Sequence, residues 1–267
     1  MIDTHTHTMF SDDSMEQPGR LIETAIERGI AYLAITDHVD RDYLFGSLRK
    51  VKQIDFHSYI KEMLILKERY KDKITLAIGA EFGYSPEASD MYSDINAKYP
   101  NLDIVINSVH TVNCRDAYFP DFFDGLSKES AYLSYLDAVK NSIDAPYDYN
   151  VIAHIGYVTR NAPYLDKAMK YNDYKDIIDE ILLNIINKNK ALEVNSRSVS
   201  HDSPFMPSKE ILVRYKELKG EMVTFASDAH IAADAGKGYK DVTDFLTKIG
   251  YKHLTAFVQR KPVFYDI

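Results

Sequence analysis

The most chemically distinctive residues near the start of the chain are two histidines, His5 and His7, in the segment DTHTH. They follow a short apolar run, and alternate residues of a β-strand point to the same side of a sheet. At a strand end the two imidazoles would aim at one point, as a metal ion requires. The alternative is a chance pair of histidines on a surface tail. The rest of the chain decides between a metal-binding pair and a chance pair.

The remaining histidines show the same preference for the ends of apolar runs. Of nine histidines, six lie at predicted strand ends, namely His5, His7, His38, His110, His154 and His230, whereas His57, His201 and His253 do not. A scatter of surface histidines would not sort in this way. The sequence therefore predicts a metal centre assembled from several strand ends.

Carboxylates complete this set of candidate ligands. Asp12 follows the first pair, Glu81 ends the run ITLAIGAE, and Asp228 precedes His230 by two residues, the spacing of the first pair. One zinc-type site takes about four ligands, so nine candidates suit two or three ions. Mixed imidazole and carboxylate ligands favour Zn, Mn or Fe over Mg and Ca. Asp12 has an alternative role as a helix N-cap or turn residue, and Asp13 is its neighbour.

The elements that must position these residues alternate between strand and helix. Strands are predicted in MID, IAYLAITDH, ITLAIGAEFGY (ending at Glu81), LDIVINSVH, YNVIAHIGYVTR, ALEVNSR, MVTFASDAH and HLTAFV, and helices over 17–29, 57–71, 128–143, 173–188, 207–218 and 239–248. Such crossovers allow parallel pairing, and this number of units suggests a barrel related to the (β/α)8 type. An open doubly wound sheet is the alternative, but only a barrel brings all the strand ends to one mouth.

Composition narrows the class of protein. The chain has 267 residues, 45% of them hydrophobic, and no linker divides it, so we expect one α/β domain over residues 1–267. A net charge of −8 argues against a partner of duplex nucleic acid. Cys114 is the single cysteine, which excludes an internal disulfide. With neither a signal-peptide pattern nor an apolar run of roughly 18 residues, we expect a soluble cytoplasmic protein without a membrane partner.

Seven segments occur in an order that resembles the polymerase and histidinol phosphatase (PHP) superfamily: DTHTHTMFSDDS, ITDH, GAEFGY, NSVHTV, IAHIGYVTR, LEVNSR and FASDAH. The ending LTAFVQRKPVFY extends a closer resemblance to the PHP-type histidinol-phosphate phosphatases. The resemblance covers nearly the whole chain and implies a distorted (β/α)7 barrel with three divalent ions. It implies His5, His7, Glu81 and Asp228 on the first ion, Glu81, His110 and His154 on the second, and Asp12, His38 and His230 on the third.

A cluster of divalent ions lowers the pKa of bound water and neutralises charge on phosphoryl oxygens. We therefore expect hydrolysis of a small phosphate monoester by a metal-bridging hydroxide, and the resemblance implies L-histidinol phosphate as the substrate, in histidine biosynthesis. Glu81 would bridge two ions, and Asp228 or His230 could protonate the leaving alkoxide.

Cationic side chains for the phosphate are also predicted at the barrel mouth. Arg160 and Arg197 lie just past strand ends, and a guanidinium binds two phosphate oxygens together. Histidinol phosphatases have arginines in these two motifs. Lys237, in DAGKGY, is a weaker candidate beside a possible helix N-terminus. Candidates for the imidazole and amine of the substrate stay open among Tyr43, Tyr84, Phe119, His201 and Asp202.

Three other functions are considered. Another PHP phosphoesterase, such as a nucleotide phosphatase or 3′ exonuclease, would share the metal site, but a nuclease should show basic and stacking residues. A non-catalytic PHP scaffold would tend to lose ligands, whereas all nine positions are filled. A metal-dependent amidohydrolase typically uses a bridging lysine, and no lysine stands at a predicted strand end.

Overall fold

The computed structural model describes residues 1–41, 53–197 and 204–267. Its main sheet follows one continuous path through β1 (Ile2–Asp3), β2 (Tyr32–Ile35), β4 (Thr75–Gly83), β5 (Ile104–Ser108), β8 (Val151–Ile152), β9 (Ala191–Asn195) and β10 (Val223–Ala226). Each pairing along this path is parallel. A further short strand, β3 (His38–Val39), pairs with the second half of β4.

Backbone hydrogen bonds return this path to its start. The Thr4 amide donates to the Phe225 carbonyl over 2.9 Å, and the His7 amide donates to the Ala229 carbonyl over 2.8 Å. These bonds join the chain after β1 to β10 and the residues that follow it. The seven strands therefore form a closed barrel, which confirms the predicted (β/α)7 architecture and excludes the open sheet.

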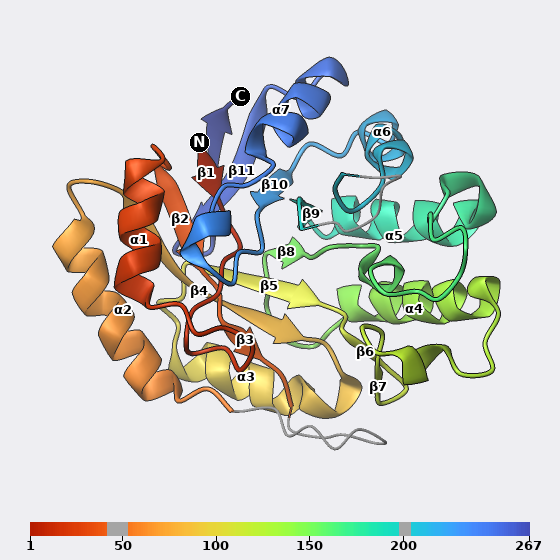
Figure 1. Cartoon of the computed structure of the whole chain (residues 1–267), viewed down its shortest axis with the longest axis horizontal. Helices are drawn as coiled ribbons and strands as arrows, with labels where there is room; N and C mark the ends of the chain where they lie inside the picture. The colour runs from red at the N-terminus through yellow and green to blue at the C-terminus, as the bar shows by residue number, and fades with distance from the viewer. Residues whose placement is uncertain (42–52, 198–203) are drawn as a thin grey trace.

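One helix follows each barrel strand within the described part of the chain, and Figure 1 shows these helices around the outside of the strands. They are α1 (Pro18–Glu27), α2 (Phe56–Tyr70), α3 (Ser89–Lys98), α4 (Lys128–Ile143), α5 (Lys175–Asn187), α6 (Lys209–Glu217) and α7 (Tyr239–Lys248). The sequence predicted all of them except α3. Only Ser89 and Tyr92 are buried in that helix, and its apolar stripe is limited to Met91, Tyr92 and Ile95, so its periodic pattern is weak.

The last predicted strand, β11 (His253–Val258), does not join the barrel. It pairs antiparallel with β12 (Lys261–Asp266). The turn between them places Gln259 and Arg260 at positive φ, 49° and 67°, as tight hairpin turns require. The Tyr32 hydroxyl donates to the Phe257 carbonyl over 2.6 Å. Because Tyr32 begins β2, this hairpin covers the amino-terminal end of the barrel.

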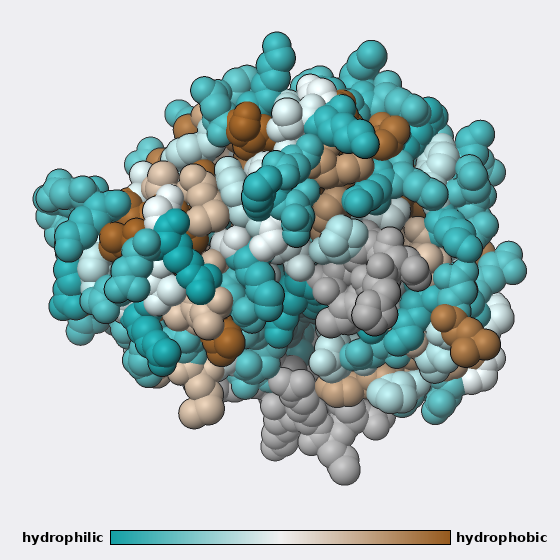
Figure 2. All heavy atoms as spheres, turned by 45° about the horizontal axis from the view of Figure 1, so that its top comes forward, coloured by the Kyte–Doolittle hydropathy of each residue, from teal (hydrophilic) through white to brown (hydrophobic). Residues whose placement is uncertain are grey.

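Shorter elements lie within the loops. A small hairpin of β6 (Thr111–Val112) and β7 (Arg115–Asp116) follows β5, and single 3₁₀ turns cover Pro86–Ala88, Pro120–Phe123, Tyr157–Thr159, Tyr171–Asp173 and Ala232–Asp234. Figure 2 shows a mostly hydrophilic face with scattered hydrophobic residues. Within the described residues, no helix is both long and apolar enough to cross a membrane.

The barrel strands are buried on both faces. Every residue of β2, β5, β9 and β10 is buried, as expected for parallel strands covered by helices. Toward their carboxyl ends the buried side chains become polar, and Glu81, Glu193 and Asn195 are fully enclosed. Burial of carboxylates is costly unless they are paired with charges or metals, so this end of the barrel is built for something other than packing.

Candidate metal centre

The carboxylate of Glu81 is the centre of a histidine cluster at the mouth of the barrel. Its Oε1 atom faces two imidazoles, of His154 (3.0 Å) and His110 (3.2 Å). Its Oε2 atom faces three, of His38 (2.7 Å), His5 (3.3 Å) and His7 (3.6 Å). One buried carboxylate thus divides five imidazoles into two sets, an arrangement suited to bridging two cations.

The strand that was predicted to end at Glu81 is longer than the sequence suggested. β4 continues for two residues to Gly83, because β3 adds to it with His38 opposite Glu81. This register places the His38 imidazole beside the carboxylate. The short strand after the ITD segment is therefore what brings His38 into the cluster.

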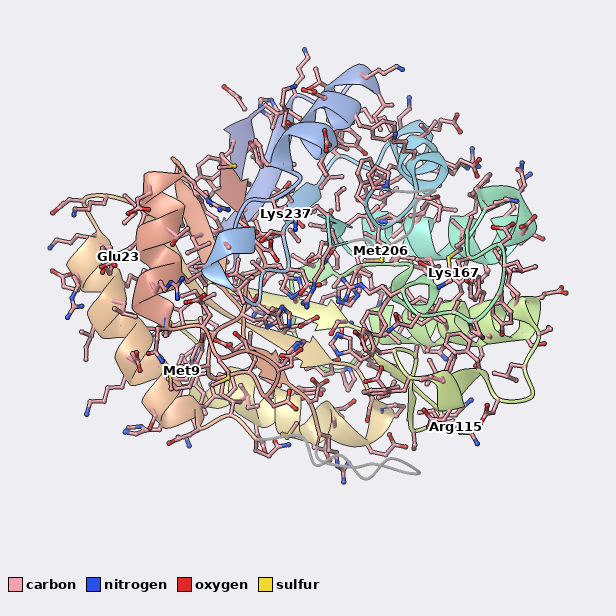
Figure 3. All side chains as sticks on the ribbon, viewed as in Figure 1. Met9, Glu23, Arg115, Lys167, Met206 and Lys237 are labelled. Atoms are coloured by element: carbon pink, nitrogen blue, oxygen red, sulfur yellow. The ribbon has the colours of Figure 1, made fainter. Side chains whose placement is uncertain are left out.

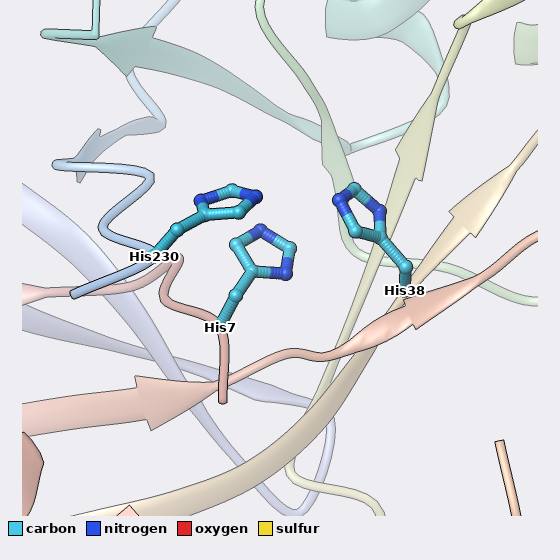
Figure 4. Close-up of side chains that lie close together, drawn as sticks. All are labelled: His7, His38 and His230. Carbon is cyan, nitrogen blue, oxygen red and sulfur yellow. The ribbon is translucent and has the colours of Figure 1, made fainter. Parts of the chain in front are cut away.

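Four groups of three side chains within the described residues bring potential metal ligands within 4.8 Å of one another. They are His5, His7 and Glu81; Glu81, His110 and His154; His7, His38 and His230; and His38, Asp40 and His110. Figure 4 shows the third group, whose rings gather from three separate segments. The His7 ring centroid lies 4.2 Å from those of both His38 and His230.

Several atoms at the centre have no hydrogen-bond partner although they are buried: His5 Nε2, His7 Nε2, His38 Nδ1 and Glu81 Oε2. Buried polar atoms are normally hydrogen-bonded, and leaving one unpaired costs about 1–3 kcal/mol. Divalent cations would satisfy these lone pairs together. Imidazole nitrogens and carboxylate oxygens are ligands of Zn, Mn and Fe, so the residues present fit a centre of such ions.

The electrostatics of Glu81 and His7 suit metal binding. Burial would lower the pKa values of His5, His38 and His110, but Glu81 and neighbouring carboxylates raise them, so that a cation would have to displace their protons. Burial alone would raise the pKa of Glu81, but the charges of His38, His5 and His110 outweigh it and hold that pKa well below its usual value. Burial, followed by the neighbouring His230 and His38, lowers the pKa of His7 well below its usual range. An ionised carboxylate and a neutral imidazole are the forms that bind metals.

The outer nitrogens of these imidazoles have partners of their own. His5 Nδ1 contacts Glu193 Oε2 at 2.8 Å, and His7 Nδ1 contacts Ser11 Oγ at 3.1 Å. Asp37 in turn accepts from the backbone and hydroxyl groups of Ser11 and Thr8. With Nδ1 engaged, Nε2 is left facing the centre, the usual way a protein orients a metal-binding histidine.

Sequence reasoning missed Glu193, Asp37 and Asp40, although each left a signal. Glu193 is a carboxylate inside an apolar strand run, where a charge needs a buried partner. Asp40 follows His38 by two residues, the spacing used for the other pairs, and its Oδ1 lies 3.4 Å from His110 Nδ1. The signal for Asp37 is its place directly before His38 in the ITDH motif.

Asp13, the neighbour of the predicted Asp12, lies beside the third group. Asp13 Oδ2 lies 2.9 Å from His230 Nε2, and its Oδ1 lies 3.7 Å from His38 Nε2. Burial opposes ionisation of Asp13, but the hydrogen bond with His230 and the charge of His38 lower its pKa below the usual value. Asp12 lines the same cavity. The turn therefore presents the second aspartate of SDDS to the histidines.

Asp228 connects the cluster to both predicted phosphate-binding arginines. Its Oδ1 lies 3.4 Å from His7 Nε2. Its Oδ2 accepts from Arg160 Nη2 over 2.7 Å, and its Oδ1 accepts from Arg197 Nη1 over 3.3 Å. Arg197 also contacts the His230 ring. Both arginines line a cavity of about 460 Å³ that opens above the histidines.

Lys237 (labelled in Figure 3), predicted as a third cation at the site, does not line this cavity. Its Nζ pairs with Asp234 over 3.0 Å, and its side chain is 72% exposed. The Lys237 side chain therefore lies outside the cavity that Arg160 and Arg197 line, which differs from the expectation that it joins them there. Phe119 lines the cavity, whereas Tyr84 does not; Tyr43, His201 and Asp202 lie outside the described residues.

Comparison with known proteins gives a consistent family. The PHP domain family matches residues 3–197. A histidinol-phosphatase of Lactococcus lactis is 30% identical over 257 residues, 96% of this chain and 94% of the relative. A Clostridium acetobutylicum protein named as a probable histidinol-phosphatase is 30% identical over 241 residues, 90% of this chain and 91% of that protein.

A solved structure agrees with these relatives. The crystal structure of histidinol phosphate phosphatase from Lactococcus lactis, complexed with Zn, L-histidinol and phosphate, matches with a TM-score of 0.89 at 30% identity and covers 98% of both chains. Sequence motifs, barrel architecture and the cluster around Glu81 therefore lead to one conclusion: this chain belongs to the PHP domain family.

Proposed function

We propose that this protein is a phosphoric monoester hydrolase that converts L-histidinol phosphate to L-histidinol and inorganic phosphate, with one domain spanning residues 1–267. The observation that carries the proposal is the placement of Arg160 and Arg197 against Asp228, at the edge of the histidine cluster and inside one cavity. Cationic forks beside a divalent metal centre suit a phosphate dianion. The Lactococcus lactis structure, which contains L-histidinol and phosphate, supports the substrate.

The proposal includes three divalent ions, of Zn, Mn or Fe. The proposed ligands are His5, His7, Glu81 and Asp228 for the first, Glu81, His110 and His154 for the second, and His38, His230 and Asp13 for the third. Two of the four close groups match the first and second ions, and a third brings His38 and His230 together with His7. When bound, such ions lower the pKa of coordinated water and offset charge on phosphoryl oxygens.

The side chains of this protein would orient the phosphate before reaction. The Arg160 side chain is only 9% exposed, donates to Asp228, and stacks over the Tyr157 ring with 5.1 Å between the guanidinium carbon and the ring centroid. Its position is therefore fixed in advance, which removes an entropic cost from the reaction. Arg197 is 44% exposed and closes the cavity from the solvent side.

Asp228 suits a ligand better than an acid. Burial would raise its pKa, but the charge of Arg160 and the contact with His7 hold that pKa well below the usual value. An ionised carboxylate has no proton for the leaving alkoxide. His230 would likewise have no free proton to give while its imidazole holds the third ion, so neither side chain suits the acid role.

Other residues of the cavity suit the imidazole and amine of the substrate. They include the aromatic rings of Tyr118 and Phe119 and the carboxylates of Asp116 and Asp121. Aromatic faces and carboxylates bind cationic groups such as an ammonium or imidazolium. The volume of about 460 Å³ also lies in the range usual for small-molecule sites, rather than for a bound polynucleotide.

The proposal is tested by assaying phosphate release after measuring bound metal. The substrates are L-histidinol phosphate, an aryl phosphate, AMP and a single-stranded oligonucleotide, with zinc or manganese added. We expect kcat/KM for L-histidinol phosphate to exceed the others by about a hundredfold or more, because its amine and imidazole add contacts the others lack. Equal or faster turnover of AMP or the oligonucleotide would instead identify another phosphoesterase.

A further inference from the structure

The side chains of Glu193 and Asn195 form a buried link behind the metal centre. Both belong to β9, two residues apart, so they point into the barrel on the same side. Both are fully buried. β9 lies between β8 and β10 in the barrel, and these two neighbours lead into His154 and Asp228. Glu193 and Asn195 therefore lie between ligands that come from opposite sides of β9.

Glu193 accepts three hydrogen bonds, one from each of three different segments. Oε2 contacts His5 Nδ1 at 2.8 Å. Oε1 accepts from the His154 backbone amide over 3.1 Å and from the Asn195 side-chain amide over 2.9 Å. His154 has a φ of 23°, a conformation that non-glycine residues rarely adopt without external support. One carboxylate thus orients a side chain of one metal group and the backbone of another.

Asn195 extends the link to the phosphate-binding side of the cavity. Its amide nitrogen donates to Asp228 Oδ2 over 3.3 Å. Its carbonyl oxygen accepts from the Arg197 backbone amide over 2.9 Å and from Arg160 Nη2 over 3.4 Å. Both oxygens of Glu193 and both polar atoms of Asn195 are therefore engaged with residues of the site.

We infer that Glu193 is a positioning residue that sets the metal affinity of the centre, and that Asn195 transmits its position to Arg160 and Asp228. This inference rests on the metal site of the proposed function. Only a carboxylate can accept on both oxygens, as the three facing N–H groups require. A glutamine could accept with its single side-chain oxygen only. Its NH₂ group would therefore face another N–H donor, either that of His5 or those of His154 and Asn195.

The first test compares Glu193→Gln with Asp103→Asn in the full-length metal-loaded protein. Asp103 is also buried and accepts the Ile78 and Gln259 amides over 2.9 and 3.0 Å, but it lies at the opposite end of the barrel. Zinc content is measured by atomic emission, and zinc affinity by competition with a chromophoric chelator. We expect Glu193→Gln to weaken zinc binding by about ten- to a hundredfold, and Asp103→Asn to leave it at the wild-type value. Equal zinc affinity in all three proteins would overturn the inference.

Asn195→Ala provides a second test that does not depend on the folding of Glu193→Gln. Glu193 keeps its bonds to His5 and His154, so zinc affinity should fall less than in Glu193→Gln. KM for L-histidinol phosphate should rise about tenfold, because a hydrogen bond to charged Arg160 is lost. An unchanged KM would remove Asn195 from the inference. The zinc measurement needs no substrate, so wild-type protein that binds zinc but does not hydrolyse L-histidinol phosphate would overturn only the proposed function.

Discussion

Arg160 donates to Asp228 over 2.7 Å, and the two side chains are only 9% and 5% exposed. This ion pair joins the phosphate-binding side of the cavity to the metal centre, because Asp228 also faces His7. Asp228 itself has a φ of 53°, a backbone conformation that carries strain in a non-glycine residue. The ion pair therefore holds the strained backbone of Asp228 and the guanidinium group of Arg160 in one geometry.

Arg160→Lys should lower activity without removing metal. A lysine keeps the charge but cannot contact Asp228 and two phosphate oxygens with a planar fork. We expect kcat/KM for L-histidinol phosphate to fall by about 10²–10³, with zinc content unchanged. Arg214→Lys is the matched control, because Arg214 forms a similar pair with Asp179 at 2.8 Å on the surface. An equal effect of the two substitutions would show that Arg160 has no special role.

Asp13→Asn and Asp12→Asn should separate the two aspartates of the SDDS turn. Asp13 contacts His230 and His38, so its loss should remove or weaken one ion, with a zinc affinity lower by about ten- to a hundredfold. Asp12→Asn should keep the wild-type zinc content. Metal analysis after dialysis gives the result, and the reverse outcome would restore Asp12 as the ligand.

The sequence contained enough information for the barrel and for most of the cluster. Histidines such as His110 and His154 interrupt apolar runs at strand ends, and parallel strands of a barrel bring their ends together. That reasoning needs no knowledge of side-chain direction. It does not determine the direction of the Lys237 side chain, which pairs with Asp234 and does not line the cavity.

Contacts between residues that are distant along the chain could not be predicted from the sequence. Glu193 contacts His5 across 188 positions, and only closure of the barrel brings them together. The choice between Asp12 and Asp13 depends on the local path of a turn, which residue type does not determine. Likewise, the strand propensity of HLTAFV was clear, but its antiparallel partner β12 depends on the turn at Gln259 and Arg260.

Glu81→Gln should disrupt more than one metal position. The carboxylate faces five imidazoles, and an amide would replace one acceptor oxygen with an N–H donor pointing at them. We expect loss of at least two ions and a fall in kcat on the order of 10³. Glu129→Gln, in the exposed first turn of α4, is the control. Full zinc content in Glu81→Gln would contradict a bridging role.

Removal of metal should reveal the charge state of His38. Burial would lower its pKa, but the charge of Glu81, with those of Asp13 and Asp40, outweighs burial and raises it to about 9. The unfolded value is about 6.5, so between these pH values the folded metal-free protein binds more protons than the unfolded chain. The contribution of His38 to stability is therefore complete below pH 6.5 and is lost as pH rises through 9.

Metal binding should show the opposite pH dependence, because the ion must displace that proton. From pH 6.5 to 9, we expect the free energy of unfolding of the metal-free protein to fall by up to roughly 3 kcal/mol through His38, while zinc affinity rises. Urea denaturation with a chelator present and zinc competition measure the two trends. His38→Gln should make both trends less steep without abolishing them, because the pKa values of His5 and His110 are also raised. Substitution of the exposed His57 on α2 should change neither. A metal-free wild type that gains stability over this range relative to His38→Gln would show that Glu81 does not hold a proton on His38.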